Sequence, residues 1–302
     1  MSRFAAMDIG TNSVKLYVAE RTPDGWRRVL DRVEITRLGQ QLMQTGRLQD
    51  EAMERTLAAM EQLLAAARAA GAGPVAAAGT MALRTAANAA DFIERARARC
   101  DLAVEVIPGE EEARLSFRAV AGDPLFAGYH VTVFDVGGGS TEFIFGGDDG
   151  IRRHSLDIGA VRFTEEILTS DPVTDTEFRR ATTAIAEEFQ TLELPPDADP
   201  LVGIGGTPTT LAAVHQRLAT YDPAAVHGFR LHRQDIQHLI EIFRGATVAQ
   251  RRSLPGMPPK RADIILAGAL IVQAVMERAG APAIRVSDSG LRHGLLRDRF
   301  GE

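Results

Sequence analysis

The same short sequence motif, which begins with an aspartate, occurs once in each half of the chain. Residues 8–13 read Asp-Ile-Gly-Thr-Asn-Ser and residues 135–140 read Asp-Val-Gly-Gly-Gly-Ser, so both fit Asp-x-Gly-x-x-Ser. Each phrase joins two apolar strands, which predicts two tight hairpins whose turn amides face a ligand. A carboxylate at such a strand end suits Mg²⁺, which prefers oxygen ligands. Asp8 and Asp135 are therefore candidate metal ligands, and Glu142, just past the second turn, is a third.

A lone Asp-x-Gly would more often cap its own turn, but two matched copies favour a functional role. Glycine loops strengthen that interpretation. The loops 137–141 and 205–207 each follow a predicted strand, and their unobstructed amides can wrap phosphate oxygens. The second of these loops also opens a helix, whose dipole favours anions. Together the loops predict a polyphosphorylated ligand. The sequence contains no G-x-x-x-x-G-K-[ST] motif, which excludes a P-loop nucleotidase.

Two further groups lie at predicted strand ends. Glu110, Glu111 and Glu112 open a helix, where the dipole favours acids in any case. One of the three carboxylates can orient a water as a general base, and spacing alone does not choose among them. Arg84 follows the predicted strand 75–78 and can clamp a phosphate with two N–H groups. A surface ion pair explains Arg84 equally well.

Strands and helices alternate along the chain, with a helix predicted over 49–70 and another over 175–191. This alternation indicates an α/β fold with a mixed sheet. The pattern restarts after residue 124, so we expect a duplicated fold with a cleft between the copies. The N-terminal lobe is expected over 1–124 and the C-terminal lobe over 125–302, with the terminal helix, about 291–302, free to pack back on the first lobe.

Composition and charge indicate a globular protein and argue against some classes of binding protein. The chain has 302 residues, 45% of them hydrophobic and 25% charged, which is typical of a globular protein with a substantial core. A net charge of −6 argues against a nucleic-acid binder. The single cysteine, the missing signal peptide and the lack of 18 consecutive apolar residues predict a cytoplasmic protein without a membrane partner. The apolar run 264–276 fits a lobe core better than a dimer surface.

Taken together, these motifs resemble the exopolyphosphatase / guanosine pentaphosphate phosphatase family, Ppx/GppA, in a short two-domain form. They follow one another in family order over nearly the whole chain. The matching segments are residues 7–13, 78–84, 107–115, 135–142, 203–207, 261–265 and 287–292.

The resemblance implies a duplicated actin-like, ribonuclease-H-like (ASKHA) fold and release of orthophosphate from the end of inorganic polyphosphate. It assigns water activation to Glu112, and Mg²⁺ (or Mn²⁺) binding to Asp8, Asp135 and Glu142. It also implies a homodimer. The residues that it assigns to phosphate binding are Gly10, Thr11, Asn12, Ser13, Arg84, Gly137, Gly138, Gly139, Ser140, Thr141, Gly205, Gly206 and Thr207. Because the chain is acidic overall, we expect local binding of the polyanion by turn amides, a cation and a few arginines.

Alternatives remain open at this point. Guanosine pentaphosphate (pppGpp) ends in the same anhydride as polyphosphate, so the motifs do not separate the two substrates. An actin-like nucleotide-binding switch, or a sugar or acetate kinase on the same fold, would also use the duplicated loops. His293 stands where many members of the family have glutamate. A surface helix position explains His293 better than a phosphate contact does.

Overall fold

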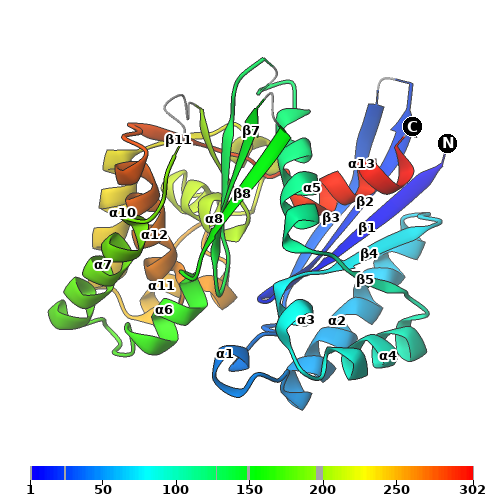
Figure 1. Cartoon of the computed structure of the whole chain (residues 1–302), viewed down its shortest axis with the longest axis horizontal. Helices are drawn as coiled ribbons and strands as arrows, with labels where there is room; N and C mark the ends of the chain where they lie inside the picture. The colour runs from blue at the N-terminus through cyan, green and yellow to red at the C-terminus, as the bar shows by residue number, and fades with distance from the viewer. Residues whose placement is uncertain (1, 24, 127, 148–149, 195–199, 302) are drawn as a thin grey trace. The chain divides into compact units, whose positions relative to one another are not determined.

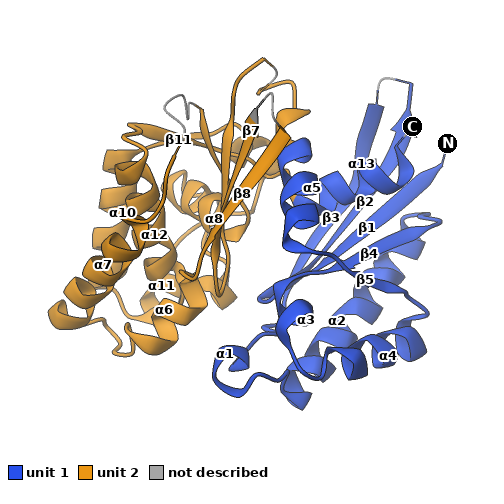
Figure 2. Cartoon of the chain, viewed as in Figure 1, with its two compact units in different colours: residues 1–119, 291–302 blue, residues 120–290 orange. Residues whose placement is uncertain are grey.

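The computed structural model describes residues 2–301 except 24, 127, 148–149 and 195–199. The chain forms two compact units, coloured separately in Figure 2: unit 1 comprises Met1–Ala119 and Leu291–Glu302, and unit 2 comprises Val120–Gly290. The chain passes from unit 1 to unit 2 inside helix α5 (Gly109–Ala121). The sequence predicted this boundary slightly later, at residue 124. The Gly/Pro signals near residue 124 therefore mark the end of a helix and not the end of a unit.

Unit 1 is built on a five-stranded sheet in the order β3-β2-β1-β4-β5 (Figure 1). The first three strands form an antiparallel meander, whereas β4 and β5 run parallel to β1. The strands are β1 (Arg3–Ile9), β2 (Ser13–Thr22), β3 (Gly25–Ile35), β4 (Val75–Gly79) and β5 (Val104–Val106). Because β1, β4 and β5 are parallel, the loops that follow them leave from one edge of the sheet.

Helices cover both faces of this sheet. On one face, Met7 and Leu16 pack with Leu57 of α2 and Phe92 of α4. On the other face, Ala6 and Tyr17 belong to a cluster with residues of α5 and α13. The alternation of side chains along β1 and β2 supplies both faces. The helices of unit 1 are α1 (Leu42–Thr45), α2 (Asp50–Ala69), α3 (Met81–Thr85), α4 (Ala89–Cys100), α5 and α13 (Leu291–Phe300).

The terminal helix α13 is fastened to unit 1 by a buried ion pair. Arg292 donates two hydrogen bonds of 2.9 Å to the carboxylate of Asp31 on β3, and both side chains are about nine-tenths buried. At Gly294 a Cβ atom would overlap the backbone carbonyl of Leu115, so α5 and α13 touch there. The terminal helix therefore belongs structurally to the lobe that begins the chain.

The interpretation of His293 as a surface residue is wrong. His293 is 7% exposed, and its ring lies 4.2 Å from that of Tyr17 between centroids. Its Nε2 is 3.7 Å from a carboxylate oxygen of Asp31. The reason is that Leu291 to Leu296, the first turns of α13, are all buried against the sheet. Burial, with the Asp31 charge second, raises the pKa of Tyr17 in this layer.

Unit 2 repeats the plan of unit 1. Its six-stranded sheet has the order β10-β11-β9-β6-β7-β8, in which β6, β7 and β8 are antiparallel and β9 and β11 continue parallel to β6. The strands are β6 (Thr132–Val136), β7 (Thr141–Gly147), β8 (Gly150–Leu156), β9 (Leu201–Ile204), β10 (Arg230–His232) and β11 (Ala283–Val286). The order β8-β7-β6-β9-β11 matches β3-β2-β1-β4-β5, which confirms the predicted duplication.

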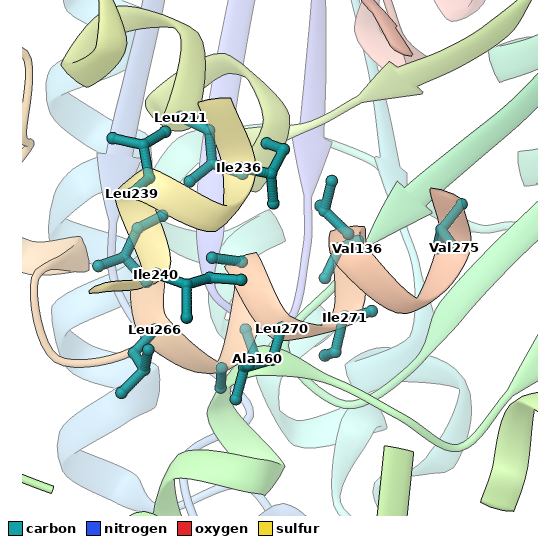
Figure 3. Close-up of a cluster of buried hydrophobic side chains, with 14 of the residues drawn as sticks. Val136, Ala160, Leu211, Ile236, Leu239, Ile240, Leu266, Leu270, Ile271 and Val275 are labelled. Carbon is teal, nitrogen blue, oxygen red and sulfur yellow. The ribbon is translucent and has the colours of Figure 1, made fainter. Parts of the chain in front are cut away.

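The core of unit 2 surrounds one apolar helix. Figure 3 shows Leu266, Leu270 and Ile271 of α12 beside Ile236 and Ile240 of α10, and all of them are buried. The apolar run over 264–276 is thus core, as predicted. No helix in the described ranges is both long and apolar enough to span a membrane. The helical segments of unit 2 are α6 (Ala160–Glu166), α7 (Asp175–Phe189), α8 (Gly206–His215), α9 (Pro223–Val226), α10 (Arg233–Gly245), α11 (Val248–Arg252), η1 (Pro259–Arg261) and α12 (Ile265–Arg278).

The buried pair leads to a stability prediction. We expect Asp31→Ala to lower the free energy of unfolding by about 3–5 kcal/mol, because it removes the buried carboxylate that accepts two hydrogen bonds from the Arg292 guanidinium. Arg99→Ala is the control: Arg99 pairs with Glu54 and Glu61 on the surface, and such exposed pairs contribute about 1 kcal/mol or less. Urea unfolding of both variants measures the difference. Equal losses would show that the pair does not hold α13 in place.

Candidate active site

The two Asp-x-Gly-x-x-Ser motifs form turns of the same kind. The amide of Gly10 donates to the carbonyl of Ser13 at 2.9 Å, and the amide of Gly137 donates to the carbonyl of Ser140 at 2.9 Å. In each turn the aspartate stands one residue before the strand ends, opposite the residue seven positions later. Asp8 pairs with Lys15 across β1 and β2, and Asp135 pairs with Glu142 across β6 and β7. Directly opposed residues of an antiparallel pair share a face, so each pair of side chains is adjacent.

In unit 1, three segments meet at the carboxyl edge of the parallel strands. The turn after β1 comes first, and the amide of Thr80, after β4, donates to the carbonyl of Ile9 at 3.2 Å. Arg84, on the short helix α3 that follows, reaches the segment after β5 and donates to the carbonyl of Ile107 at 3.0 Å. This edge is the usual position of a ligand site in an open α/β sheet.

The structure separates the three glutamates that the sequence left equivalent. Glu112 accepts a hydrogen bond of 2.8 Å from Arg84, and both side chains are about three-quarters buried. Glu111 instead forms two hydrogen bonds of 2.7 Å with Arg114 of its own helix, and these hold its pKa below the usual value. Glu110 is exposed. Glu112 is therefore the acid that the fold directs to Arg84 at the carboxyl edge.

Asp8 has a partner that the sequence analysis did not include in the site. Lys15 donates to Oδ2 of Asp8 at 2.9 Å, and the Asp8 side chain is 4% exposed against 20% for Lys15. A signal was present in the sequence, because Lys15 follows Asp8 at the same spacing at which Glu142 follows Asp135. Lys15 is also one of only two lysines in the chain, the other being Lys260.

In unit 2, Glu142 is held mainly by hydroxyl groups. Its Oε1 accepts hydrogen bonds from Ser140 at 2.6 Å and from Ser155 at 3.2 Å, and Arg153 lies 3.5 Å away. Asp135, directly opposite, lies against Gly205, where a Cβ atom would overlap its carboxylate. Gly205 has φ +81°, a left-handed conformation that favours glycine. The turn after β6 and the loop after β9 therefore approach each other at Asp135.

A second residue absent from the sequence-based site is Arg261. Its guanidinium lies against the backbone of Gly206, the first residue of α8, where a Cβ atom would overlap it. Burial lowers the pKa of this guanidinium, and the charge of Asp135 opposes the shift. Arg261 lies in one of the segments that resemble the family, but its residue type and position predicted no role for it. A fixed cation at a helix N-terminus makes this loop suited to an anion.

Several predicted phosphate-binding residues also form hydrogen bonds with other segments of the chain. Thr141 donates its hydroxyl to the carbonyl of Ile158 at 2.6 Å, and Thr207 donates to the carbonyl of Val136 at 3.4 Å. The carbonyl of Asn12 accepts the amides of Thr36 and Arg37, whereas the buried Oδ1 of Asn12 has no hydrogen-bond partner in the structure. The remaining predicted positions lie in the same turns: Gly10, Thr11, Ser13, Gly138 and Gly139 in the hairpins, and Gly206 at the start of α8.

The carboxylates present fit a magnesium ion whose coordination is completed by phosphate oxygens and water. Across the residues with described positions, no three His, Cys, Asp or Glu side chains cluster as a closed metal site. Mg²⁺ is, however, usually held by one or two carboxylates together with phosphate oxygens and water. Asp135 and Glu142, on one face of one hairpin, match that donor set. Asp8 fits it less well, since the Lys15 ammonium already compensates its charge.

Comparison with known proteins identifies the family. The model of the Ppx/GppA phosphatase family matches residues 17–301. The chain belongs to the Ppx/GppA phosphatase family. It is 37% identical over 314 residues to Exopolyphosphatase 2 of Mycobacterium tuberculosis, with 98% of each chain covered. This Ppx/GppA chain is therefore an enzyme of the phosphatase class, and the switch-protein and kinase alternatives are set aside.

Solved structures place the fold in the same family. The Aquifex aeolicus Ppx/GppA family member superposes with a TM-score of 0.82 at 36% identity, covering 99% of this chain and 97% of that one. An exopolyphosphatase from Cytophaga hutchinsonii gives a TM-score of 0.88 at 26% identity, with 99% and 97% covered. The predicted duplicated actin-like α/β fold is confirmed. The individual roles of the site residues, the metal and the homodimer stay predictions.

The loop at Gly206 supplies the test of this site. We expect Gly206→Ala to weaken binding of inorganic pyrophosphate ~10- to 100-fold, since the added methyl group displaces the Arg261 guanidinium, which would otherwise donate charged hydrogen bonds to the ligand. Gly245→Ala is the matched control, because a Cβ atom at that position meets nothing within 4 Å. Isothermal titration calorimetry measures both affinities. Unchanged affinity in Gly206→Ala would remove Arg261 and its loop from the site.

Proposed function

We propose that the protein is an exopolyphosphatase, which hydrolyses the terminal phosphoanhydride of inorganic polyphosphate and releases orthophosphate. The Arg84–Glu112 pair carries this proposal, because it places one carboxylate beside one guanidinium at the carboxyl edge of β1, β4 and β5. Exopolyphosphatase 2, at 37% identity over nearly the whole length of both chains, supports the choice of substrate.

The chemistry needs few groups. Glu112 accepts a proton from water as the water oxygen bonds to the terminal phosphorus. The bridging P–O bond breaks, and its electron pair stays on the shortened chain. Phosphoryl transfer depends mainly on positioning and charge neutralisation, so a water-orienting carboxylate and phosphate-binding donors suffice. In this scheme the turn amides around Gly10 are the phosphate donors of unit 1, and those around Gly137 and the N-terminus of α8 are the phosphate donors of unit 2.

Arg84 has two roles in the proposal. With no substrate bound it holds the Glu112 carboxylate and anchors to the Ile107 carbonyl. A polyphosphate end presents more negative charge than one carboxylate, so its oxygens compete for the same guanidinium. Binding of substrate would then free Glu112 to accept a proton.

A metal fits this scheme in unit 2. Asp135 and Glu142 would hold Mg²⁺, with Mn²⁺ as the alternative ion. When bound, the ion would neutralise charge on the phosphates. Its proposed ligands do not include Glu112, so water activation is assigned to a residue of unit 1.

The three glutamates at the start of α5 provide the test. We expect Glu112→Gln to slow orthophosphate release from medium-chain polyphosphate with Mg²⁺ by ~100- to 10,000-fold, the usual contribution of a general base. Glu110→Gln should retain the wild-type rate, because Glu110 is exposed on the same helical turn. A colorimetric phosphate assay gives both rates. A wild-type protein that releases no orthophosphate, or a Glu112→Gln variant as fast as wild type, would contradict the proposal.

The same assay with pppGpp settles substrate preference. Although the two substrates share the terminal anhydride, the proposal predicts that kcat/KM is higher for polyphosphate. A higher value for pppGpp would instead assign the guanosine pentaphosphate phosphatase activity.

A further inference from the structure

A chain of ion pairs on unit 1 joins three elements that are far apart in the sequence. On α13, the carboxylate of Asp298 accepts a hydrogen bond of 2.7 Å from Arg114 of α5 and another from Arg299. Arg114 also donates two hydrogen bonds of 2.7 Å to Glu111. Arg299 in turn donates to both carboxylate oxygens of Glu105, on β5, at 2.9 and 3.0 Å. These five residues, which we name the Asp298 cluster, link β5, α5 and α13 (Figure 1).

Asp298 is the centre of this cluster and differs from the exposed acids of unit 1. Its side chain is 17% exposed, and a third arginine, Arg118, lies 3.7 Å from its carboxylate. Burial alone would raise the pKa of Asp298, but the hydrogen bond from Arg114 and the neighbouring arginine charges outweigh burial and lower it. By contrast, the side chain of Glu54, which bonds two arginines on the surface of α2 and α4, is 56% exposed. Asp298 is therefore a charged carboxylate that several arginines hold in a largely buried position.

The Asp298 cluster holds both ends of the segment that leads to Glu112. Glu105 lies before this segment, on β5, and Glu111 lies at its end, on the first turn of α5. Between them, the carbonyl of Ile107 accepts a hydrogen bond from Arg84, the same residue that donates to Glu112. The cluster thus anchors at two points the segment that Arg84 contacts in the middle.

Two neighbouring positions on α5 make these contacts in different directions. Successive side chains of an α-helix point about 100° apart, so Glu111 and Glu112 leave the helix on different sides. Glu111 is held by Arg114, which itself bonds Asp298 on α13. Glu112 is held by Arg84. Because a rotation of α5 would move both carboxylates by the same angle, fixing the first of them also fixes the direction of the second.

We propose that Asp298 is a positioning residue for Glu112. Through Arg114 and Glu111 it sets the rotation of α5, and this rotation directs the Glu112 carboxylate to the carboxyl edge of the sheet, beside Arg84. This role rests on the proposed function, because it takes Glu112 as the group that activates water. Asp298 then affects the reaction without touching the substrate, since a small displacement of a general base lowers the rate steeply.

Steady-state kinetics with medium-chain polyphosphate and Mg²⁺ test this role. We expect Asp298→Asn to lower kcat ~10- to 100-fold and to change KM by about twofold or less, because it displaces the base without removing a phosphate donor. Asp298→Glu, which keeps the charge, should restore part of the rate. Glu54→Gln is the matched control and should keep the wild-type rate, since Glu54 also bonds arginines of unit 1 but lies outside this segment. Thermal unfolding of each variant reports folding.

A double variant separates positioning from a general loss of structure. If Asp298 acts through Glu112, adding Asp298→Asn to Glu112→Gln should lower the rate no further. A full additional loss in the double variant would overturn the proposal, as would wild-type kcat in Asp298→Asn.

A crystal structure of Asp298→Asn gives a readout that needs no turnover. The hydrogen bond from Arg84 to Glu112, 2.8 Å long in the wild-type chain, should be lost in the variant, and its retention would also overturn the proposal. A wild-type protein that releases no orthophosphate would refute the proposed function. The crystal structures of the wild type and of Asp298→Asn would then still decide whether Asp298 sets the direction of Glu112.

Discussion

One backbone hydrogen bond, from the amide of Gly10 to the carbonyl of Ser13, is formed again between Gly137 and Ser140. It closes a turn short enough that the aspartate before it must face the residue seven positions later. This constraint creates the Asp8–Lys15 pair and the Asp135–Glu142 pair. The parallel strands beside each turn then bring Arg84 and Glu112 to one edge in unit 1, and Gly205 and Asp135 together in unit 2.

Charge explains how an acidic chain can act on a polyanion. The net charge of −6 provides no general attraction for phosphate. The cations of the site are instead single groups at defined points, each held by the fold. Arg84 is anchored to a carbonyl and Lys15 to a buried carboxylate, and Arg261 lies against the start of a helix. Groups fixed in this way lose little freedom when a ligand binds.

Local patterns in the sequence predicted much of the fold. The helix expected over 49–70 is α2 (Asp50–Ala69), because its apolar spacing and length leave little ambiguity. The repeated Asp-x-Gly-x-x-Ser motif predicted the duplication, because it marks a turn between two strands in each half of the chain. β10 (Arg230–His232) was missed because three residues show no alternation, and its pairing with β11 joins segments far apart in sequence. His293 was misplaced because the burial of α13 depends on a sheet formed at the other end of the chain.

The site was predictable where it depends on turns and not where it depends on packing. Asp8, Asp135 and the glycines could be identified from one phrase. The Arg84–Glu112 contact joins two helices 28 residues apart, so spacing did not distinguish Glu112 from its neighbours. Lys15 follows Asp8 at the spacing that links Glu142 to Asp135, but its pairing with Asp8 follows only from the strand register. Arg261 depends on the approach of η1 to α8, which no local pattern contains.

In the proposed reaction, water attacks the free end of a phosphate chain. The most direct measurement compares orthophosphate release from ordinary polyphosphate and from polyphosphate whose two terminal phosphates are chemically blocked, with Mg²⁺ and the same chain length. We expect steady release from the free-ended polymer and none from the blocked one. Equal release from both would mean that internal bonds are cleaved, and would contradict this reaction.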